Sequence, residues 1–247
     1  MQSITVVFAA LIAGASCLFA QGSGAVWATD SAVPCAGLTV GWHVAAGTLQ
    51  ALIGSRGTVA ADSTGRGVVI LFATTCSGTT IDGRPTGPVA LGAAIVRLAP
   101  QTDTTLAPGT RWSAVPAAFG PAGAPVTGLV QRSGFDVGTG PVSLHADSSA
   151  GARRVTFVIA TAKGRIEATA LIGDSVSHFA LTGALLATGT RHPGRFAGQE
   201  WATRRGGTAT VRATGETLLS QLAITAPPDI VAYDTGFGWR FTFSADR

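Results

Sequence analysis

Lys163 is the one lysine of the chain, and its chemistry is the simplest to evaluate. An activated lysine can attack a carbonyl carbon and form a Schiff base. A neighbouring cation such as Arg165 could activate it if both side chains faced a closed interior. The Lys163-Gly164 pair, however, stands between two strand-like runs, which is typical of a β-hairpin tip. We therefore predict a solvated, protonated amine, which is a poor nucleophile.

Two other stretches carry polar groups that could bind a ligand. Arg165, Glu167 and Thr169 alternate with apolar residues, so they share one strand face, which is either exposed to solvent or a polar lining inside an open barrel. The densest polar and aromatic region runs from 191 to 205, and its guanidinium groups could grip a carboxylate or phosphate, unless it is an exposed loop with a cross-strand ion pair. The predicted ligand-binding candidates are Arg165, Glu167, Glu200, Trp201 and Arg204.

Other catalytic arrangements have less support. His43 and the Tyr233-Asp234 pair could supply acid and base groups, but a structural role is favoured for each. Gly173-Asp174-Ser175 does not continue as a nucleophile elbow and leads into a strand instead of a helix. No metal-ligand spacing, phosphate-binding loop or dinucleotide fingerprint occurs. We therefore expect neither a metal nor a cofactor.

The first twenty residues predict export. Met1 to Ala20 carries no charged side chain, is mostly apolar and runs into a Gly/Ser-rich segment, as secretory signals do. Cleavage is expected after Ala20, or as late as Ala28, which leaves residues 21–247 as the mature chain. Because Ile4 to Ala20 is only 17 residues long, an uncleaved membrane anchor is less favoured, as is lipidation at Cys17. The predicted location is secreted, periplasmic or extracellular.

Removal of the signal leaves two cysteines, Cys35 and Cys76. An oxidising compartment favours a disulfide between them, and two buried free thiols are the alternative. Net charge is +4, from 17 basic and 13 acidic residues. These charges are few and scattered, which argues against nucleic acid as a partner. A mature chain of about 227 residues without a linker predicts one domain.

Alternation of apolar residues with period two predicts strands over most of the chain. They are expected at Leu38–Val44, Gly67–Thr74, Val89–Leu98, Val126–Arg132, Pro141–Ala146, Arg153–Ala160, Arg165–Leu171, His178–Ala187, Thr208–Ala213 and Trp239–Ser244. Two short helices are expected at Thr48–Ile53 and Glu216–Leu222, with Thr48 and Thr214 as N-caps and Gly54 ending the first helix. The predicted fold class is mainly β with minor α, in a single antiparallel barrel or sandwich-like domain.

The succession of a short helix (Leu49–Gly54) and two strands (Val68–Phe72 and Ala90–Val96) resembles the opening of acetoacetate-decarboxylase-like β proteins. The resemblance implies a decarboxylase that uses a lysine as Schiff-base nucleophile, activated by an adjacent cation, usually a second lysine. This chain has Lys163 alone, so the family's paired lysines are absent.

Three function classes follow from these observations. The favoured one is an exported β domain that binds a small apolar, amphipathic or anionic ligand without catalysis. The second is a cofactor-free enzyme, a lyase or hydrolase, on the decarboxylase-like scaffold. The third is a structural or interaction protein of the envelope or an extracellular assembly, which would have a protein partner. The mature chain is expected to hold no stable membrane span.

Overall fold

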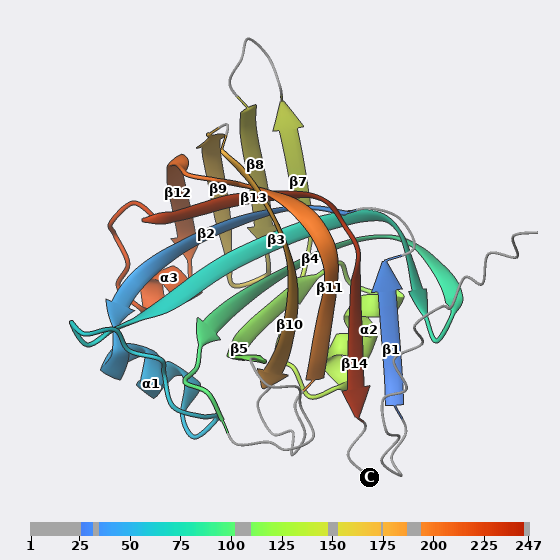
Figure 1. Cartoon of the computed structure of the whole chain (residues 1–247), viewed down its shortest axis with the longest axis horizontal. Helices are drawn as coiled ribbons and strands as arrows, with labels where there is room; N and C mark the ends of the chain where they lie inside the picture. The colour runs from blue at the N-terminus through green and yellow to red at the C-terminus, as the bar shows by residue number, and fades with distance from the viewer. Residues whose placement is uncertain are drawn as a thin grey trace, which may run out of the picture.

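The computed structural model describes residues 26–31, 35–101, 110–147, 153–173, 175–186 and 194–244. The predicted signal segment, Met1 to Ala20, lies outside these residues. The described chain forms two β-sheets and three helices (Figure 1), which confirms the predicted mainly β class with minor α. None of the helices in this part of the chain is long and apolar enough to cross a membrane.

The larger of the two sheets, called the large sheet, contains ten strands. They are β1 (Val26–Ser31), β2 (Cys35–Ala45), β3 (Arg66–Ile81), β4 (Arg84–Arg97), β5 (Arg111–Gly120), β6 (Val137–Thr139), β10 (Val176–Leu186), β11 (Gly194–Arg205), β13 (Ile230–Phe237) and β14 (Trp239–Ser244). The small sheet has four strands, which are β7 (Val142–Asp147), β8 (Arg153–Ala160), β9 (Gly164–Ile172) and β12 (Gly207–Gly215).

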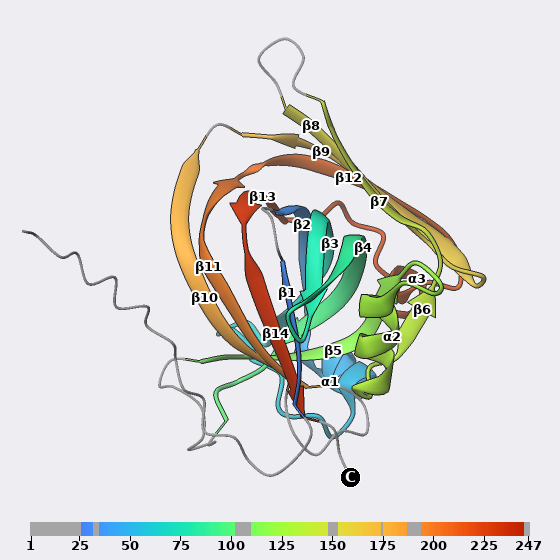
Figure 2. The same ribbon diagram turned by 90° about the vertical axis from the view of Figure 1, so that its right-hand side faces the viewer.

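The large sheet is strongly curled. Its strand order is β1-β14-β11-β10-β5-β4-β3-β2-β13, with β6 beside β5. Strand β13, at one end of this order, also hydrogen-bonds to β11. Figure 2 shows the resulting curl, with β10 and β11 on the opposite side from β3 and β4. Strand β5 runs parallel to β10 and β6, so this sheet is mixed, although only antiparallel pairing was predicted.

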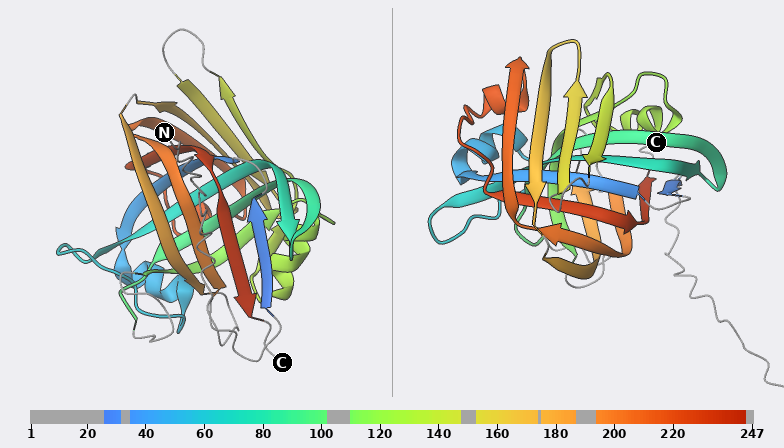
Figure 3. Two further views of the ribbon diagram at one scale, coloured as in Figure 1. Left: turned by 45° about the vertical axis from the view of Figure 1, so that its right-hand side comes forward. Right: turned by 90° about the horizontal axis from the view of Figure 1, so that it is seen from above.

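The small sheet packs across one face of the large sheet, as expected for a sandwich. Seen from above, its strands cross those of the large sheet at a steep angle (Figure 3). The core between the sheets includes Leu71 of β3, Val96 of β4 and Phe157 of β8, all fully buried. A Cβ atom on Gly92 would lie only 2.8 Å from Cδ1 of Ile159, so the close approach of the sheets requires glycine there. The sandwich-like alternative of the prediction is therefore confirmed.

The three helices are α1 (Ala46–Ile53), α2 (Pro125–Arg132) and α3 (Leu218–Gln221). Helices α1 and α3 were predicted. Gly54 ends α1 as expected, with a positive φ of 60°, but its ψ of -131° differs from the left-handed helical conformation that was predicted. The predicted N-caps were wrong, because α1 begins after Ala45 and α3 begins after Thr217, whose hydroxyl accepts from the Ser220 amide.

The strand predicted at Val126–Arg132 was also wrong, because this segment forms α2. Pro125 occupies the first helical turn, where the missing N–H is not needed. Val126, Leu129 and Val130 then fall on one side of the helix, at the spacing that a helix needs to bury an apolar face. Helical periodicity, rather than the β-branched residues at the start of the segment, decides its structure.

Helix α2 packs against the inner face of the large sheet, meaning the face turned away from the small sheet. Val126 belongs to one apolar cluster with Cys35, Cys76, Val89, Phe237 and Trp239. Leu129 belongs to a second cluster with Val115, Ala118 and Phe135. Since these partners come from β2, β3, β4, β5, β13 and β14 or their neighbouring loops, α2 holds distant parts of the curl together.

The predicted disulfide is present within the first of these clusters. Cys35 and Cys76 are directly paired between β2 and β3, with their Cα atoms 4.3 Å apart. The indole N–H of Trp239 donates a hydrogen bond to Sγ of Cys76 at 3.3 Å. The disulfide therefore joins two neighbouring strands at the point where α2 and β14 cover them.

Replacing Cys35 and Cys76 together by Ala should lower the free energy of unfolding by about 4 kcal/mol, because the bond closes a loop of roughly 42 residues in the unfolded chain. Urea unfolding of the variant and of the oxidised protein measures the difference. The reduced wild-type protein is the control and should match the variant. A loss below about 1 kcal/mol would show that the bond contributes little.

Leu129→Ala should lower the free energy of unfolding by about 2–5 kcal/mol, because it leaves a cavity beneath α2. Leu129 is fully buried, whereas Leu171 of β9 is 44% exposed. The matched Leu171→Ala variant should therefore stay within about 0.5 kcal/mol of the wild type. Equal losses in urea unfolding of the two variants would contradict the packing described for α2.

Candidate functional site

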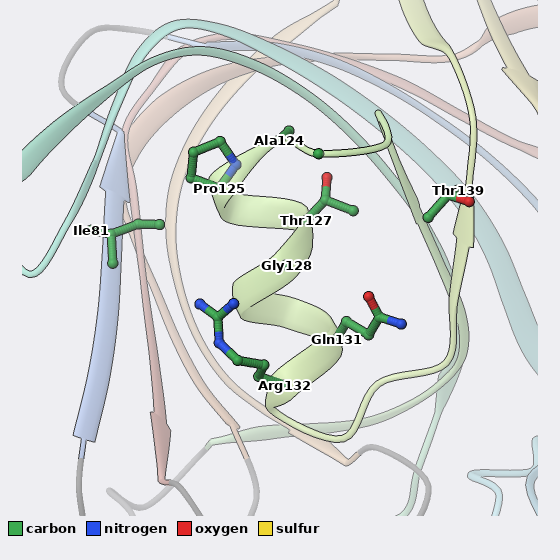
Figure 4. Close-up of a pocket in the computed structure, with 9 residues that line it drawn as sticks. Ile81, Ala124, Pro125, Thr127, Gly128, Gln131, Arg132 and Thr139 are labelled. Atoms are coloured by element: carbon green, nitrogen blue, oxygen red, sulfur yellow. The ribbon is translucent and has the colours of Figure 1, made fainter.

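A groove of about 410 Å³ lies beside α2. Figure 4 shows α2 framed by Ile81, at the end of β3, and by Thr139, on β6. The apolar side chains of the groove are Ile81, Ala124 and Pro125. Its polar side chains are Thr127, Gln131, Arg132 and Thr139, and Gly123 and Gly128 leave the backbone uncovered. The lining is thus amphipathic.

Thr127 is the buried polar residue of the groove. Its side chain is 3% exposed, and its hydroxyl has no hydrogen-bond partner. A Cβ atom on Gly120 would lie 2.4 Å from this hydroxyl oxygen, so the oxygen rests against bare glycine backbone. A buried hydroxyl without a partner costs about 1–3 kcal/mol. The oxygen atom itself is inaccessible to solvent from the groove.

Arg132 supplies the positive charge of the groove. It stands in the last turn of α2, and its side chain turns back along the helix toward Gly128. A Cβ atom on Gly128 would lie 3.3 Å from Nη1 of Arg132, so the guanidinium lies close over this glycine. None of the residues that line the groove is acidic.

Groups with shifted pKa values lie elsewhere in the described chain. Burial raises the pKa of Tyr233, although the guanidinium of Arg153, 5.6 Å from the ring centre, opposes the shift. A hydrogen bond from the Arg66 backbone amide lowers the pKa of Asp62. Burial lowers the pKa of Arg56. None of these three residues lines the groove.

The described part of the chain also holds no cluster of three or more His, Cys, Asp or Glu side chains that could bind a metal ion. His43 contacts Asp229 at 2.9 Å, with both side chains well exposed, and Asp234 accepts a hydrogen bond from the Thr203 hydroxyl. Both pairs connect neighbouring segments of the β structure, which fits the structural roles predicted for His43 and Asp234.

The structure places Lys163, Arg165 and Glu167 together at one end of the small sheet. Lys163 is exposed at the turn between β8 and β9, where the sequence predicted a hairpin tip. Nη2 of Arg165 lies 2.9 Å from Oε2 of Glu167, and both side chains are exposed. The strand face that carries Arg165 and Glu167 is therefore exposed to solvent, and it is not a polar lining inside a barrel. Neither residue lines the groove along α2.

The other predicted site residues lie on β11, which corrects the expectation of an exposed loop. Although glycines and arginines interrupt this segment, β10, β14 and β13 satisfy its backbone hydrogen bonds. Arg204 is half-buried and pairs with Val176 and Tyr233. Glu200 and Trp201 belong to the same strand, but their side chains lie outside the description, as does Asp174. Ligand binding by these residues stays a prediction.

The groove along α2 could not be predicted from the sequence, because its walls come from three separate segments of the chain. One signal was available, since Pro125 followed by apolar residues at helical spacing indicates a helix that begins there. That signal could have placed Thr127 and Gly128 on its polar side. The contributions of Ile81 and Thr139 depend on strand pairing and could not be derived from local sequence.

Neither a protein-family model nor the sequence of a curated protein matches the chain. Solved structures do match its fold. The enduracididine biosynthesis enzyme MppR complexed with pyruvate has a TM-score of 0.53 at 13% identity, over 90% of this chain and 89% of that one.

Two further structures give similar values. An acetoacetate decarboxylase-like enzyme from Sphingomonas wittichii RW1 has a TM-score of 0.54 at 14% identity, over 91% of this chain and 93% of that one. Acetoacetate decarboxylase from Legionella pneumophila has a TM-score of 0.52 at 12% identity, over 90% and 86%. At sequence identities this low, these matches show a shared fold and nothing about function. The chain therefore has an acetoacetate-decarboxylase-like fold, as the sequence resemblance implied.

Proposed function

We propose that this chain is an exported, non-catalytic protein that binds a small amphipathic ligand in the groove along α2. The observation that carries the proposal is the groove itself, whose walls combine apolar side chains such as Ile81 and Pro125 with polar ones such as Gln131 and Thr139. Small-molecule sites typically combine apolar walls with a few placed polar groups.

Export is proposed from the apolar, uncharged segment Met1 to Ala20. The Cys35–Cys76 disulfide supports it, because such bonds persist in oxidising compartments and are rare in the cytosol. Solved structures of similar fold support the binding of small molecules, since MppR occurs with pyruvate and with HEPES bound.

An enzyme is the second candidate, and the similarity to acetoacetate decarboxylases favours it. A Schiff base would require Lys163, which is exposed on a hairpin and is not part of the groove. Val126 and Leu129, which pack into the clusters beneath α2, are apolar. These positions favour binding over catalysis.

Incubation with acetoacetate followed by borohydride should leave the mass of the protein unchanged, because a solvated lysine on a hairpin tip is protonated and a poor nucleophile. Intact-mass spectrometry reads this result, and an acetoacetate decarboxylase treated in parallel is the positive control. A stable adduct on Lys163, together with decarboxylation of acetoacetate, would establish the enzyme instead.

Filling the groove should abolish ligand binding. Gly128→Phe places a ring over the groove, whereas Gly47→Phe on α1 is the matched control, because nothing lies within 4 Å of a Cβ atom there. Calorimetric titrations with hexan-1-ol, hexanamide and hexanoate should detect binding of at least one compound to the wild type and to Gly47→Phe. Gly128→Phe should bind none. Absence of binding to the wild type, or unchanged binding to Gly128→Phe, would contradict the proposed function.

A further inference from the structure

We infer that the chain has a second binding site, for the phosphate group of a small molecule, formed by Arg153, Arg204 and Tyr233 where the two sheets meet. None of these residues lines the groove along α2, so the inference does not depend on the proposed function. Three observations support it: the convergence of the three residues, the lack of acidic partners for the arginines, and the unpartnered hydroxyl of the tyrosine.

The three residues come from three strands and both sheets. Tyr233 of β13 and Arg204 of β11 are directly opposite each other in the large sheet, so their side chains share one face of it. Arg153 begins β8 of the small sheet, and its guanidinium carbon lies 5.6 Å from the centre of the Tyr233 ring. Seen from above, the start of β8 lies over β13 (Figure 3). Two arginines therefore flank the same tyrosine.

Neither arginine has an acidic partner within the described part of the chain. Arg153 makes a cation–π contact with Tyr233, and Arg204 takes part in no ion pair or side-chain hydrogen bond there. Asp234 is next to Tyr233 in sequence, but it belongs to the opposite face of β13 and accepts a hydrogen bond from Thr203. Both arginines are half-buried, and partly buried charges without partners are unfavourable. A bound anion would stabilise both.

Tyr233 supplies a neutral hydrogen-bond donor. The residue is only 5% exposed, and its ring belongs to the core between the sheets. Its hydroxyl makes no hydrogen bond within the described chain, and its oxygen, unlike that of Thr127, keeps some contact with solvent. Burial raises the pKa of Tyr233, so the hydroxyl is protonated near neutral pH and can donate. An oxygen of a bound anion would be the missing acceptor.

The charge of the site indicates which anion it binds. A guanidinium group offers parallel N–H donors that match two oxygens of a phosphate. Two such groups balance the charge of a phosphate monoester, which is about −1.5 to −2 near neutral pH. A carboxylate has a single charge and would leave one arginine uncompensated. A small phosphate monoester and a phospholipid headgroup share the favoured chemistry, so the experiment below compares both.

The test is calorimetric titration of the mature protein at low salt with glycerol 3-phosphate, and with acetate and glycerol as controls. Glycerol 3-phosphate should bind at least about tenfold more tightly than acetate, as an additional charge-assisted contact typically provides. Glycerol should not bind. Arg153→Gln and Arg204→Gln should each weaken phosphate binding about tenfold. Arg212→Gln is the matched control, because Arg212 is exposed on β12, and it should leave binding unchanged.

Tyr233→Phe separates a role in binding from a role in packing. The variant keeps the ring and loses only the hydroxyl, so it should bind glycerol 3-phosphate about fivefold more weakly. Its melting temperature should not fall, because the lost hydroxyl has no protein partner. A variant that melts as the wild type does and binds phosphate less tightly would support a direct contact between the hydroxyl and the ligand.

Three outcomes would overturn the inference. Absence of glycerol 3-phosphate binding, or equal binding of acetate, would reject a phosphate site. Unchanged binding by Arg153→Gln, Arg204→Gln and Tyr233→Phe would place the phosphate elsewhere. Sedimentation with phosphatidylglycerol vesicles that requires Arg204, without binding of glycerol 3-phosphate, would replace the small molecule by a membrane lipid. Gly128→Phe should bind glycerol 3-phosphate as the wild type does, which keeps this test separate from that of the groove.

Discussion

The packing of α2 inside the curl of the large sheet is the constraint on which the site depends. The large sheet has no second sheet on its inner face, so that face must be covered by another element. An eight-residue helix covers it with three apolar side chains, Val126, Leu129 and Val130. The Cys35–Cys76 bond and the Trp239 indole complete the same cluster. The position of α2 thus follows from core packing and does not require a ligand.

This packing determines which chemistry is available around the helix. Val126 and Leu129, on its buried side, are apolar and pack into the two clusters beneath it. The polar positions of α2, including Thr127, Gln131 and Arg132, lie along the groove instead. A scaffold that resembles acetoacetate decarboxylases therefore presents here a helix end, a hydroxyl and a guanidinium.

Much of the fold could be predicted from local sequence. The sequence correctly predicted alternating strands such as Arg153–Ala160 and the hairpin at Lys163, because both depend on short-range pattern. It also predicted the disulfide, because only two cysteines remain after the signal segment. α2 was missed because Val126 and Thr127 favour strands and Gly128 disfavours helices, while burial of its apolar face decides the outcome. Strand β11 was not predicted because its glycines and arginines are typical of a loop. Its strand structure depends on pairing with β10, β13 and β14, which are distant in sequence.

The site itself was beyond local prediction. Its walls come from Ile81, from α2 and from Thr139, which strand pairing brings together. The absence of hydrogen bonding at Thr127 depends on the bare backbone of Gly120, which no sequence pattern would indicate. Polar candidates such as Arg165 and Glu167 were more conspicuous in the sequence, yet they form an exposed ion pair with each other.

The most direct test of this account is a crystal structure of the protein soaked with hexanoate, because it locates the ligand without relying on variants. The account predicts hexanoate in the groove beside α2, between Ile81 and Thr139. Density for hexanoate beneath α2, among the side chains around Trp239, would contradict it. That result would show that the inner face of the curl, and not the outer side of α2, is the binding site.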